Sequence, residues 1–270
     1  MKSLIKRVVR RLGYDLVAHE HFNVVPKGYV DDNFVRLTSR YGALLKSTFI
    51  PSLPELDSTR CRLLARLEGV PLEQVLFIMN QLHASLALAG DVCEFGVASG
   101  ATSAVWANML LPTQKNLWLF DSFQGLPAPT AKDKLKNDIF GLGDMSKYQG
   151  QMSYPEASVR ARLGEVGFPP GRCRIIPGFI EQVVKSQALP ETVCFAFVDM
   201  DFYEPVKTVL DCLHKAIVPN GVVIVHDYDF FSTGAKTACD EFFDQHQAHY
   251  AREIPSEPFK GICVFRRLAG

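Results

Sequence analysis

The chain has 270 residues, a formal net charge of +0, 47% hydrophobic and 21% charged residues. This balance is typical of a globular protein of one domain or two closely packed ones, and the neutral charge argues against nucleic acid as a partner. No apolar run reaches the ~18 residues that a membrane-spanning helix needs. The cysteines are scattered without a C-x-x-C pair, which favours a reducing, cytoplasmic location.

Residues 1–88 are predicted to form a helical extension. At its start, Leu4, Ile5, Val8 and Leu12 recur at helical spacing, and lysines and arginines occupy the remaining faces. Such a basic helix packs on the body or on a second subunit, as in a homodimer or larger assembly. Alternatively, it makes a peripheral contact with the anionic inner face of a membrane.

Residues 89–270 alternate between short apolar runs and helical patterns. The runs predict strands at Val92–Val97, Leu117–Phe120, Arg174–Ile176, Cys194–Val198, Val222–Val225 and Ile262–Phe265. The main helical segments between them are Thr102–Leu111, Pro205–Ile217 and Ala235–His246. Strand–helix alternation of this length predicts a doubly wound α/β sheet.

One segment interrupts the alternation. Residues 128–155 are polar, contain glycine and show little periodicity. Because a loop this long in a compact domain is usually functional or disordered, we interpret it as a lid or substrate wall.

The stretch "DVCEFGVASGATS" predicts the first turn of a ligand site. A strand ends at Glu94, Gly96 and Gly100 follow, and a helix begins near Thr102. Glycine at such a turn allows close approach of backbone to a ligand. The spacing differs from the G-x-G-x-x-G of dinucleotide enzymes and suits a ligand without phosphate, such as S-adenosylmethionine. Glu94 then either meets the ammonium group of the ligand or braces the loop.

A second acid supports the same ligand. "LWLFDSFQGLP" is an apolar strand that ends at Asp121, 27 residues after Glu94. A carboxylate at the end of the second strand is placed to bind the hydroxyls of an adenosine ribose.

Further acids follow two later strands. Asp199 and Asp201 end one apolar run, and His226, Asp227 and Asp229 end another. The carboxyl ends of strands converge on one crevice, and several carboxylates there favour a divalent cation, Mg²⁺ or Mn²⁺. We expect Asp199 and Asp227 to be ligands with His226 as a borderline donor, and Asp229 to be a loop residue.

Together, "GDVCEFGVASGATS", "LWLFDSFQGLPAPT", "PGFIE", "FVDMDFYEP" and "HDYDFFSTGAKTACDEF" resemble the macrocin and mycinamicin O-methyltransferase family. The resemblance runs from about Gly90 to the C-terminus. It implies a Rossmann-like class I methyltransferase fold, with a mostly parallel seven-stranded sheet and helices on both faces. It also implies an S-adenosylmethionine-dependent, metal-assisted enzyme that methylates a hydroxyl of a sugar or polyol in a natural product, glycolipid or polysaccharide.

The resemblance also implies roles for individual residues. The expected cofactor-binding residues are Glu94, Gly96, Ser99, Gly100, Asp121, Ser122, Gly178 and Phe179, the last two near the adenine. Asp199, Asp227 and His226 are the expected metal ligands, and Asp199, Asp201 and His226 the expected catalytic residues. Asp201 is expected to be a third ligand or a base. His226 departs from the family, because relatives often carry two adjacent aspartates there. It is therefore a ligand, a general base or neither.

Three other classes remain as alternatives at this stage. A nicotinamide-dependent oxidoreductase shares the α/β pattern but would need G-x-G-x-x-G. A hydrolase could use Ser99 at the strand-to-helix turn, although the G-x-S-x-G motif is missing. A non-catalytic binding or scaffold protein could retain the fold alone.

Overall fold

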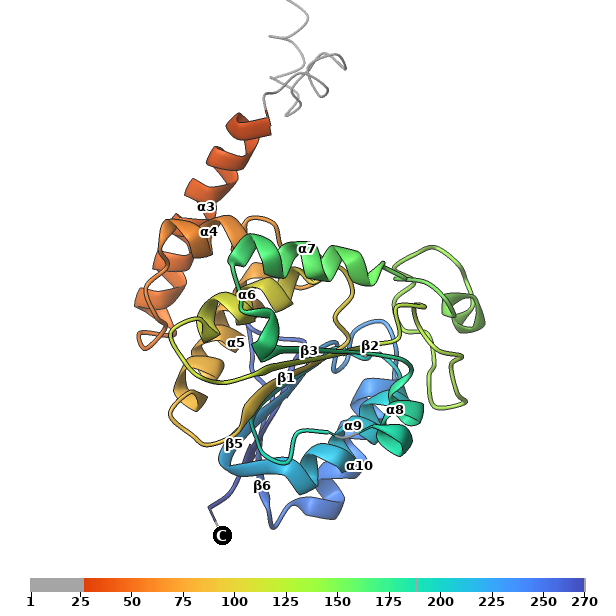
Figure 1. The fold of residues 1–270 in the computed structure, drawn as a ribbon. Coiled ribbons are helices and arrows are strands. Elements are labelled where there is room, and N and C mark those ends of the chain that lie inside the picture. Colours follow the sequence, from red (N-terminus) through yellow and green to blue (C-terminus); the bar gives the residue numbers. More distant parts are fainter. Residues whose placement is uncertain (1–26, 188, 270) are drawn as a thin grey trace, which may run out of the picture.

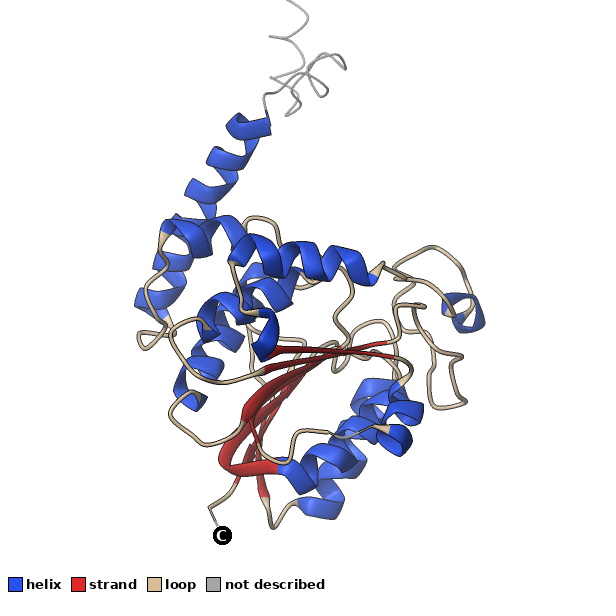
Figure 2. Ribbon diagram, viewed as in Figure 1, coloured by secondary structure: helices blue, strands red, loops and turns tan. Residues whose placement is uncertain are grey.

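The computed structural model describes residues 27–187 and 189–269, so the predicted basic helix near the N-terminus lies outside the described residues. The described part folds as a central sheet between two layers of helices (Figures 1 and 2). The doubly wound α/β prediction is confirmed.

The described residues form a seven-stranded sheet of order β3-β2-β1-β4-β5-β7-β6. Its strands are β1 (Asp91–Phe95), β2 (Leu117–Asp121), β3 (Cys173–Pro177), β4 (Val193–Val198), β5 (Ile217–Val225), β6 (Tyr250–Glu253) and β7 (Cys263–Arg267). The first five pair in parallel, and β7 pairs antiparallel with both β5 and β6. Every residue of β4 is buried, as expected of a central parallel strand covered on both faces.

The helices divide between the two faces of the sheet (Figure 1). One face packs against α5 (Leu72–Ser85), α6 (Ala101–Leu110) and α7 (Glu156–Val166). The other packs against α8 (Ile180–Ser186), α9 (Tyr203–Ala216) and α10 (Gly234–His246). In α9 the buried residues Val206, Val209, Leu210 and Leu213 follow helical spacing, so one stripe of the helix covers the sheet.

The N-terminal helices differ in how they meet this body. Helix α3 (Lys27–Thr48) projects away from it in Figure 1, and α4 (Ser58–Leu64) lies at its base. Phe34, Leu37 and Leu44 of α3 are exposed. In contrast, most of α5 is buried in the same apolar cluster as β1, β2 and β4. None of the helices in the described part of the chain is long and apolar enough to cross a membrane.

The predicted lid, residues 128–155, is a long loop with one short 3₁₀ helix, η1 (Met145–Tyr148). A second such helix, η2 (Pro170–Arg172), precedes β3. Met145 and Tyr148 of the lid pack in a small apolar cluster with Leu126, Phe202 and Phe231 of the body. The lid is therefore a packed segment anchored to the body.

Candidate functional site

A cleft lies at the carboxyl ends of the central strands, beside the reversal of strand order between β1 and β4. Ligands of open α/β sheets bind at this position. The cleft contains about 1030 Å³, including space open to solvent. Its walls come from the turn after β1, the ends of β2, β4 and β5, the start of α8 and the lid residues Met152 and Tyr154.

The lining of the cleft is acidic. Its carboxyl groups belong to Glu68, Asp121, Glu181, Asp199, Asp201 and Asp227. Among the described residues that line it there is no lysine or arginine, and His226 is the one basic side chain. Such a lining favours a cationic ligand and opposes one that carries phosphate.

Gly96 and Gly100 are explained by contacts within the protein. Gly96 has a φ of 80°, and a Cβ there would lie 1.9 Å from the carbonyl oxygen of Asp199. Gly100 has a φ of 81° at the N-cap of α6, where a Cβ would lie 3.0 Å from the Cα of Val159. Gly96 lines the cleft and Gly100 does not. The glycines therefore allow backbone to approach backbone, which then shapes the wall of the cleft.

Asp121 holds the turn after β1 in place. Its Oδ2 accepts hydrogen bonds from the backbone N–H groups of Val97 (2.7 Å) and Ala98 (2.9 Å), and its Oδ1 accepts one from Phe123 (2.7 Å). A carboxylate oxygen has two lone pairs, so Oδ1 retains one for a ligand hydroxyl. Asp121 lines the cleft, where the sequence places it.

Glu94 is a buried brace rather than a cleft residue. Its side chain is 0% exposed, and it accepts hydrogen bonds from Thr102 Oγ1 (2.5 Å), Ser103 Oγ and Trp106 Nε1 (3.2 Å) of α6. Burial raises the pKa of Glu94 to about 8, against the opposite effect of the three donors. Of the two roles left open for Glu94, the geometry supports bracing the loop.

The remaining expected cofactor residues lie at the cleft in different ways. Ser99 donates to Glu68 Oε2 (2.6 Å). A hydrolase would require a histidine hydrogen-bonded to this serine, and the described residues show no such bond. Ser122 donates to the carbonyl of Gly125 (3.0 Å) and so closes a turn. Gly178 and Phe179 precede α8 and face the same cleft.

Asp199, His226 and Asp227 come together as predicted. His226 Nδ1 lies 2.9 Å from Asp199 Oδ1 and 3.2 Å from Asp227 Oδ1. Each of the three residues offers one potential ligand atom, and these atoms lie within 4.8 Å of one another. Their side chains are 24%, 3% and 18% exposed in the order Asp199, His226 and Asp227, so the aspartates face the cleft more than the imidazole does.

Asp201 lies in the same cluster and is 8% exposed. Burial, followed by the charges of Asp199 and Asp227, raises its pKa well above the ordinary value, and its carboxyl group shares a hydrogen bond with Asp227. Burial likewise raises the pKa of Asp227 to about 6, which the cation of His226 opposes. Asp201 is therefore suited to carry a proton near neutral pH. Asp229 lies in the following loop, as expected.

Gln74 of α5 is a residue of this cluster that the motif analysis missed. Its Oε1 lies 2.7 Å from His226 Nε2, although the two residues are 152 positions apart. Its Nε2 donates to the carbonyl of Lys260 (2.6 Å). In the sequence, the available signal for this contact was a polar residue directly before the apolar run Val75–Met79.

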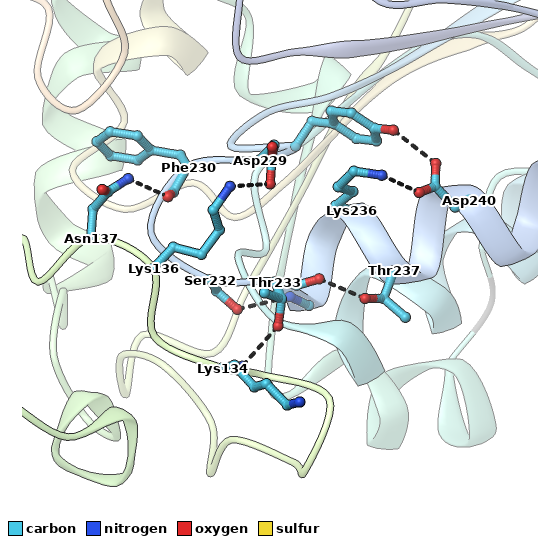
Figure 3. A network of polar contacts seen from close by, with 12 residues as sticks. Lys134, Lys136, Asn137, Asp229, Phe230, Ser232, Thr233, Lys236, Thr237 and Asp240 are labelled. Atoms are coloured by element: carbon cyan, nitrogen blue, oxygen red, sulfur yellow. Dashed lines mark hydrogen bonds and ion pairs between the residues drawn. The ribbon is translucent and has the colours of Figure 1, made fainter.

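The base of the lid is bound to the loop that follows β5 (Figure 3). Lys136 Nζ pairs with Asp229, and the Asn137 side chain donates to the carbonyl of Phe230. The Lys134 backbone N–H donates to Thr233 Oγ1 (2.9 Å), and the Thr233 N–H donates back to the Lys134 carbonyl (3.0 Å). This base is therefore fixed to the segment that carries Asp227.

Comparison with known families gives one match to a family model. Residues 72–265 match the macrocin O-methyltransferase family. The matched region begins at the first residue of α5 and includes nearly all of the sheet.

Two curated relatives are similar over part of their length. A tetracenomycin-derivative 4'-O-methyltransferase of Streptomyces olivaceus is 26% identical over 181 residues, 66% of this chain and 66% of the relative. The mycinamicin III 3''-O-methyltransferase of Micromonospora griseorubida is 26% identical over 163 residues, 58% of this chain and 61% of the relative. The matches thus span less than two thirds of the relatives' own lengths.

Solved structures share the fold. The O-methyltransferase NovP superposes with a TM-score of 0.59 at 20% identity, covering 73% of this chain and 79% of NovP. The calicheamicin methyltransferase CalS11 gives a TM-score of 0.57 at 19% identity, covering 86% of this chain and 91% of CalS11. The chain therefore has the architecture predicted from its sequence.

Proposed function

The chain belongs to the macrocin O-methyltransferase family, and from that premise we propose that it is an S-adenosylmethionine-dependent O-methyltransferase acting on a sugar hydroxyl. The observation that carries the proposal is the acidic cleft at the switch point of the sheet. Its carboxyl groups favour a ligand with a sulfonium and an ammonium group. The same lining opposes the pyrophosphate of a nicotinamide dinucleotide.

The cofactor would lie along the turn after β1. The backbone of residues 96–99 would meet its methionine part, and Asp121 Oδ1 would accept from a ribose hydroxyl through its remaining lone pair. Gly178 and Phe179 would flank the adenine. Glu94 would act indirectly, by holding α6 and the turn in place.

S-adenosylmethionine supplies a methyl group on a sulfonium, which an acceptor oxygen can displace without an enzyme-bound intermediate. Asp199 would accept the proton of the acceptor hydroxyl, because its carboxylate lines the cleft and is oriented by His226. Asp201, whose pKa is raised by burial and which shares a hydrogen bond with Asp227, would hold Asp227 in position. Positioning the two reactants contributes on the order of 7–11 kcal/mol in favourable cases.

The acceptor would bind between these acids and the lid. Met152 and Tyr154 of the lid line the cleft, and both similar enzymes bear names of O-methyltransferases for glycosylated natural products. A sugar of a natural product is therefore the proposed acceptor, and a glycolipid or polysaccharide shares the same chemistry.

The proposed mechanism does not use the expected Mg²⁺ or Mn²⁺. Asp199 and Asp227 have the oxygen donors that such ions prefer. His226 does not fit as the third ligand, because each of its ring nitrogens already faces an acceptor oxygen. The same contacts leave His226 without a free nitrogen to act as a base.

The test is titration of the protein with S-adenosylhomocysteine, on wild type and on Asp121→Ala. We expect micromolar binding that Asp121→Ala weakens by about 10-fold or more, since the substitution removes a ligand acceptor and frees three loop amides. Titration with NADH is the control and should give no binding. Absence of S-adenosylhomocysteine binding by wild type would favour a scaffold protein instead.

Assembly and location extend the proposal. The exposed apolar residues Phe34, Leu37 and Leu44 on α3 support a homodimer or larger assembly, which light scattering would test. The free cysteines are consistent with a cytoplasmic location. Co-sedimentation with anionic vesicles would test peripheral membrane contact through the basic N-terminal segment.

A further inference from the structure

The environment of His226 determines where its protons lie. The ring is 3% exposed and lies between β4, β5 and α5. Nδ1 faces two carboxylate oxygens, those of Asp199 at 2.9 Å and Asp227 at 3.2 Å. Ionised carboxylates can only accept hydrogen bonds, so Nδ1 carries a proton.

The other ring nitrogen is fixed by Gln74. The Gln74 amide nitrogen donates to the Lys260 carbonyl at 2.6 Å, which places the amide oxygen toward His226 Nε2 at 2.7 Å. Turning the amide over would bring two acceptor oxygens to 2.6 Å, so this orientation is the one that satisfies both contacts. An amide oxygen only accepts, and Nε2 therefore also carries a proton.

The charges around the ring are consistent with an imidazolium. The carboxylates of Asp199 and Asp227 lie beside the ring, and Asp201 belongs to the same cluster. Gln74 on α5 and the ring of Phe197 on β4, 6.0 Å away, are neutral. Glu94 on β1 is the next acidic group, and the charge of Asp199 contributes to the raised pKa of Glu94.

An imidazolium has no lone pair for a metal ion. Its Nδ1–H group lies between Oδ1 of Asp199 and Oδ1 of Asp227, so these two oxygens already have a cationic partner. The positive charge offsets one of the two negative charges of Asp199 and Asp227 without any ion.

We propose that His226 is the resident cation of this site, an imidazolium that takes the place of a divalent metal and holds the Asp199 and Asp227 carboxylates toward the acceptor. The role is that of a positioning residue, and it rests on the proposed methyl transfer. The acceptor proton passes to Asp199, the acceptor oxygen forms its bond to the methyl carbon, and the electron pair of the broken carbon–sulfur bond remains on sulfur.

The first test is ¹⁵N NMR of the full chain with labelled histidine, from pH 6.5 to 8. His226→Asn identifies the signals of the ring. We expect both ring nitrogens of His226 to be protonated across this range. An unprotonated ring nitrogen at pH 7 would overturn the proposal.

The second test is binding of Mn²⁺ alone, followed by electron paramagnetic resonance. His226→Asp replaces the internal cation with a third carboxylate, so we expect it to bind Mn²⁺ about 100-fold more tightly than wild type. His249→Asp introduces the same carboxylate at an exposed position and should bind like wild type. Micromolar Mn²⁺ binding by wild type would overturn the proposal, and this result does not depend on the folding of any variant.

These readouts separate the two proposals. Neither NMR nor Mn²⁺ binding requires methyl transfer, so a failed activity assay would leave the inference on His226 standing. If wild type transfers methyl groups, EDTA should change its rate by less than about twofold, since no resident ion is removed. Loss of that activity in EDTA, restored by Mg²⁺, would overturn the inference and leave the methyltransferase proposal intact.

Discussion

The two ends of the cleft are built in different ways. Around the ends of β1 and β2, the wall is mostly backbone, which Asp121 holds through hydrogen bonds to the turn and Glu94 supports from behind through side chains of α6. At the ends of β4 and β5, the wall is made of charged side chains, with Asp199, His226 and Asp227 facing one another. Substitutions should therefore act through shape at the first end and through charge at the second.

The largest expected effect is at the charged end. Asp199→Asn keeps the size of the side chain but removes the base, so we expect kcat for methyl transfer to fall by about 10²–10⁴-fold. Binding of S-adenosylhomocysteine should change little. Asp211→Asn, on the outer side of α9, removes one exposed carboxylate and is the control. Equal activity of both variants would show that Asp199 is not the base.

At the other end of the cleft, substitutions of Glu94 should change the free energy of unfolding. Glu94→Ala leaves Thr102, Ser103 and Trp106 without their buried acceptor and should cost about 3–5 kcal/mol in the free energy of unfolding. Glu94→Gln keeps an acceptor and should cost about 1 kcal/mol. Urea unfolding measures both, and equal costs would contradict the bracing role.

Glu94 should also make the stability of the protein depend on pH. The pKa of Glu94 is raised to about 8, so the folded protein keeps a proton that the unfolded chain releases above its ordinary value near 4.5. The contribution of this group to stability is therefore full below pH 4.5 and is lost as pH rises toward 8. Glu94→Gln should remove this decline, measured by unfolding at pH 5 and pH 8.

Substitution of Gly96 tests whether its close approach to the Asp199 carbonyl shapes this end of the cleft. Gly96→Ala should lower stability and weaken S-adenosylhomocysteine binding, because the new Cβ would meet the Asp199 carbonyl. Gly69→Ala is a matched control, with a φ of 81° and no atom within 4 Å of the new Cβ. It should cost only about 1 kcal/mol, from conformation alone. Similar melting temperatures for the two variants would mean that the close approach is unimportant.

The smallest effect is expected at the lid. Lys136→Ala removes an ion pair with Asp229 whose side chains are 36% and 44% exposed. Pairs of this kind contribute about 0–1 kcal/mol, so we expect KM for the acceptor to rise by less than about fivefold and kcat to stay unchanged. A large fall in kcat would show that residues 132–137 of the lid control the charged side chains at the ends of β4 and β5.

Much of the site follows from the sequence, because carboxyl ends of parallel strands must meet at one edge of a sheet. That rule places Asp121, Asp199 and Asp227 correctly. It does not reveal that a Cβ at Gly96 would meet the Asp199 carbonyl, since this depends on the distance between two neighbouring strands. It also does not reveal Gln74, because the contact of α5 with His226 arises only when the helix packs on the sheet.

The lid divides into a fixed base and a more exposed tip. Residues 132–137 are bound to the loop after β5, whereas Ile139 and Phe140 are 40% and 43% exposed. Met152 and Tyr154, farther along the lid, line the cleft. Exchanging that part of the lid would alter the wall offered to an acceptor and leave the reacting groups at the ends of β4 and β5 in place. A lineage could in this way gain a new glycan specificity from a short graft, without rebuilding the chemistry.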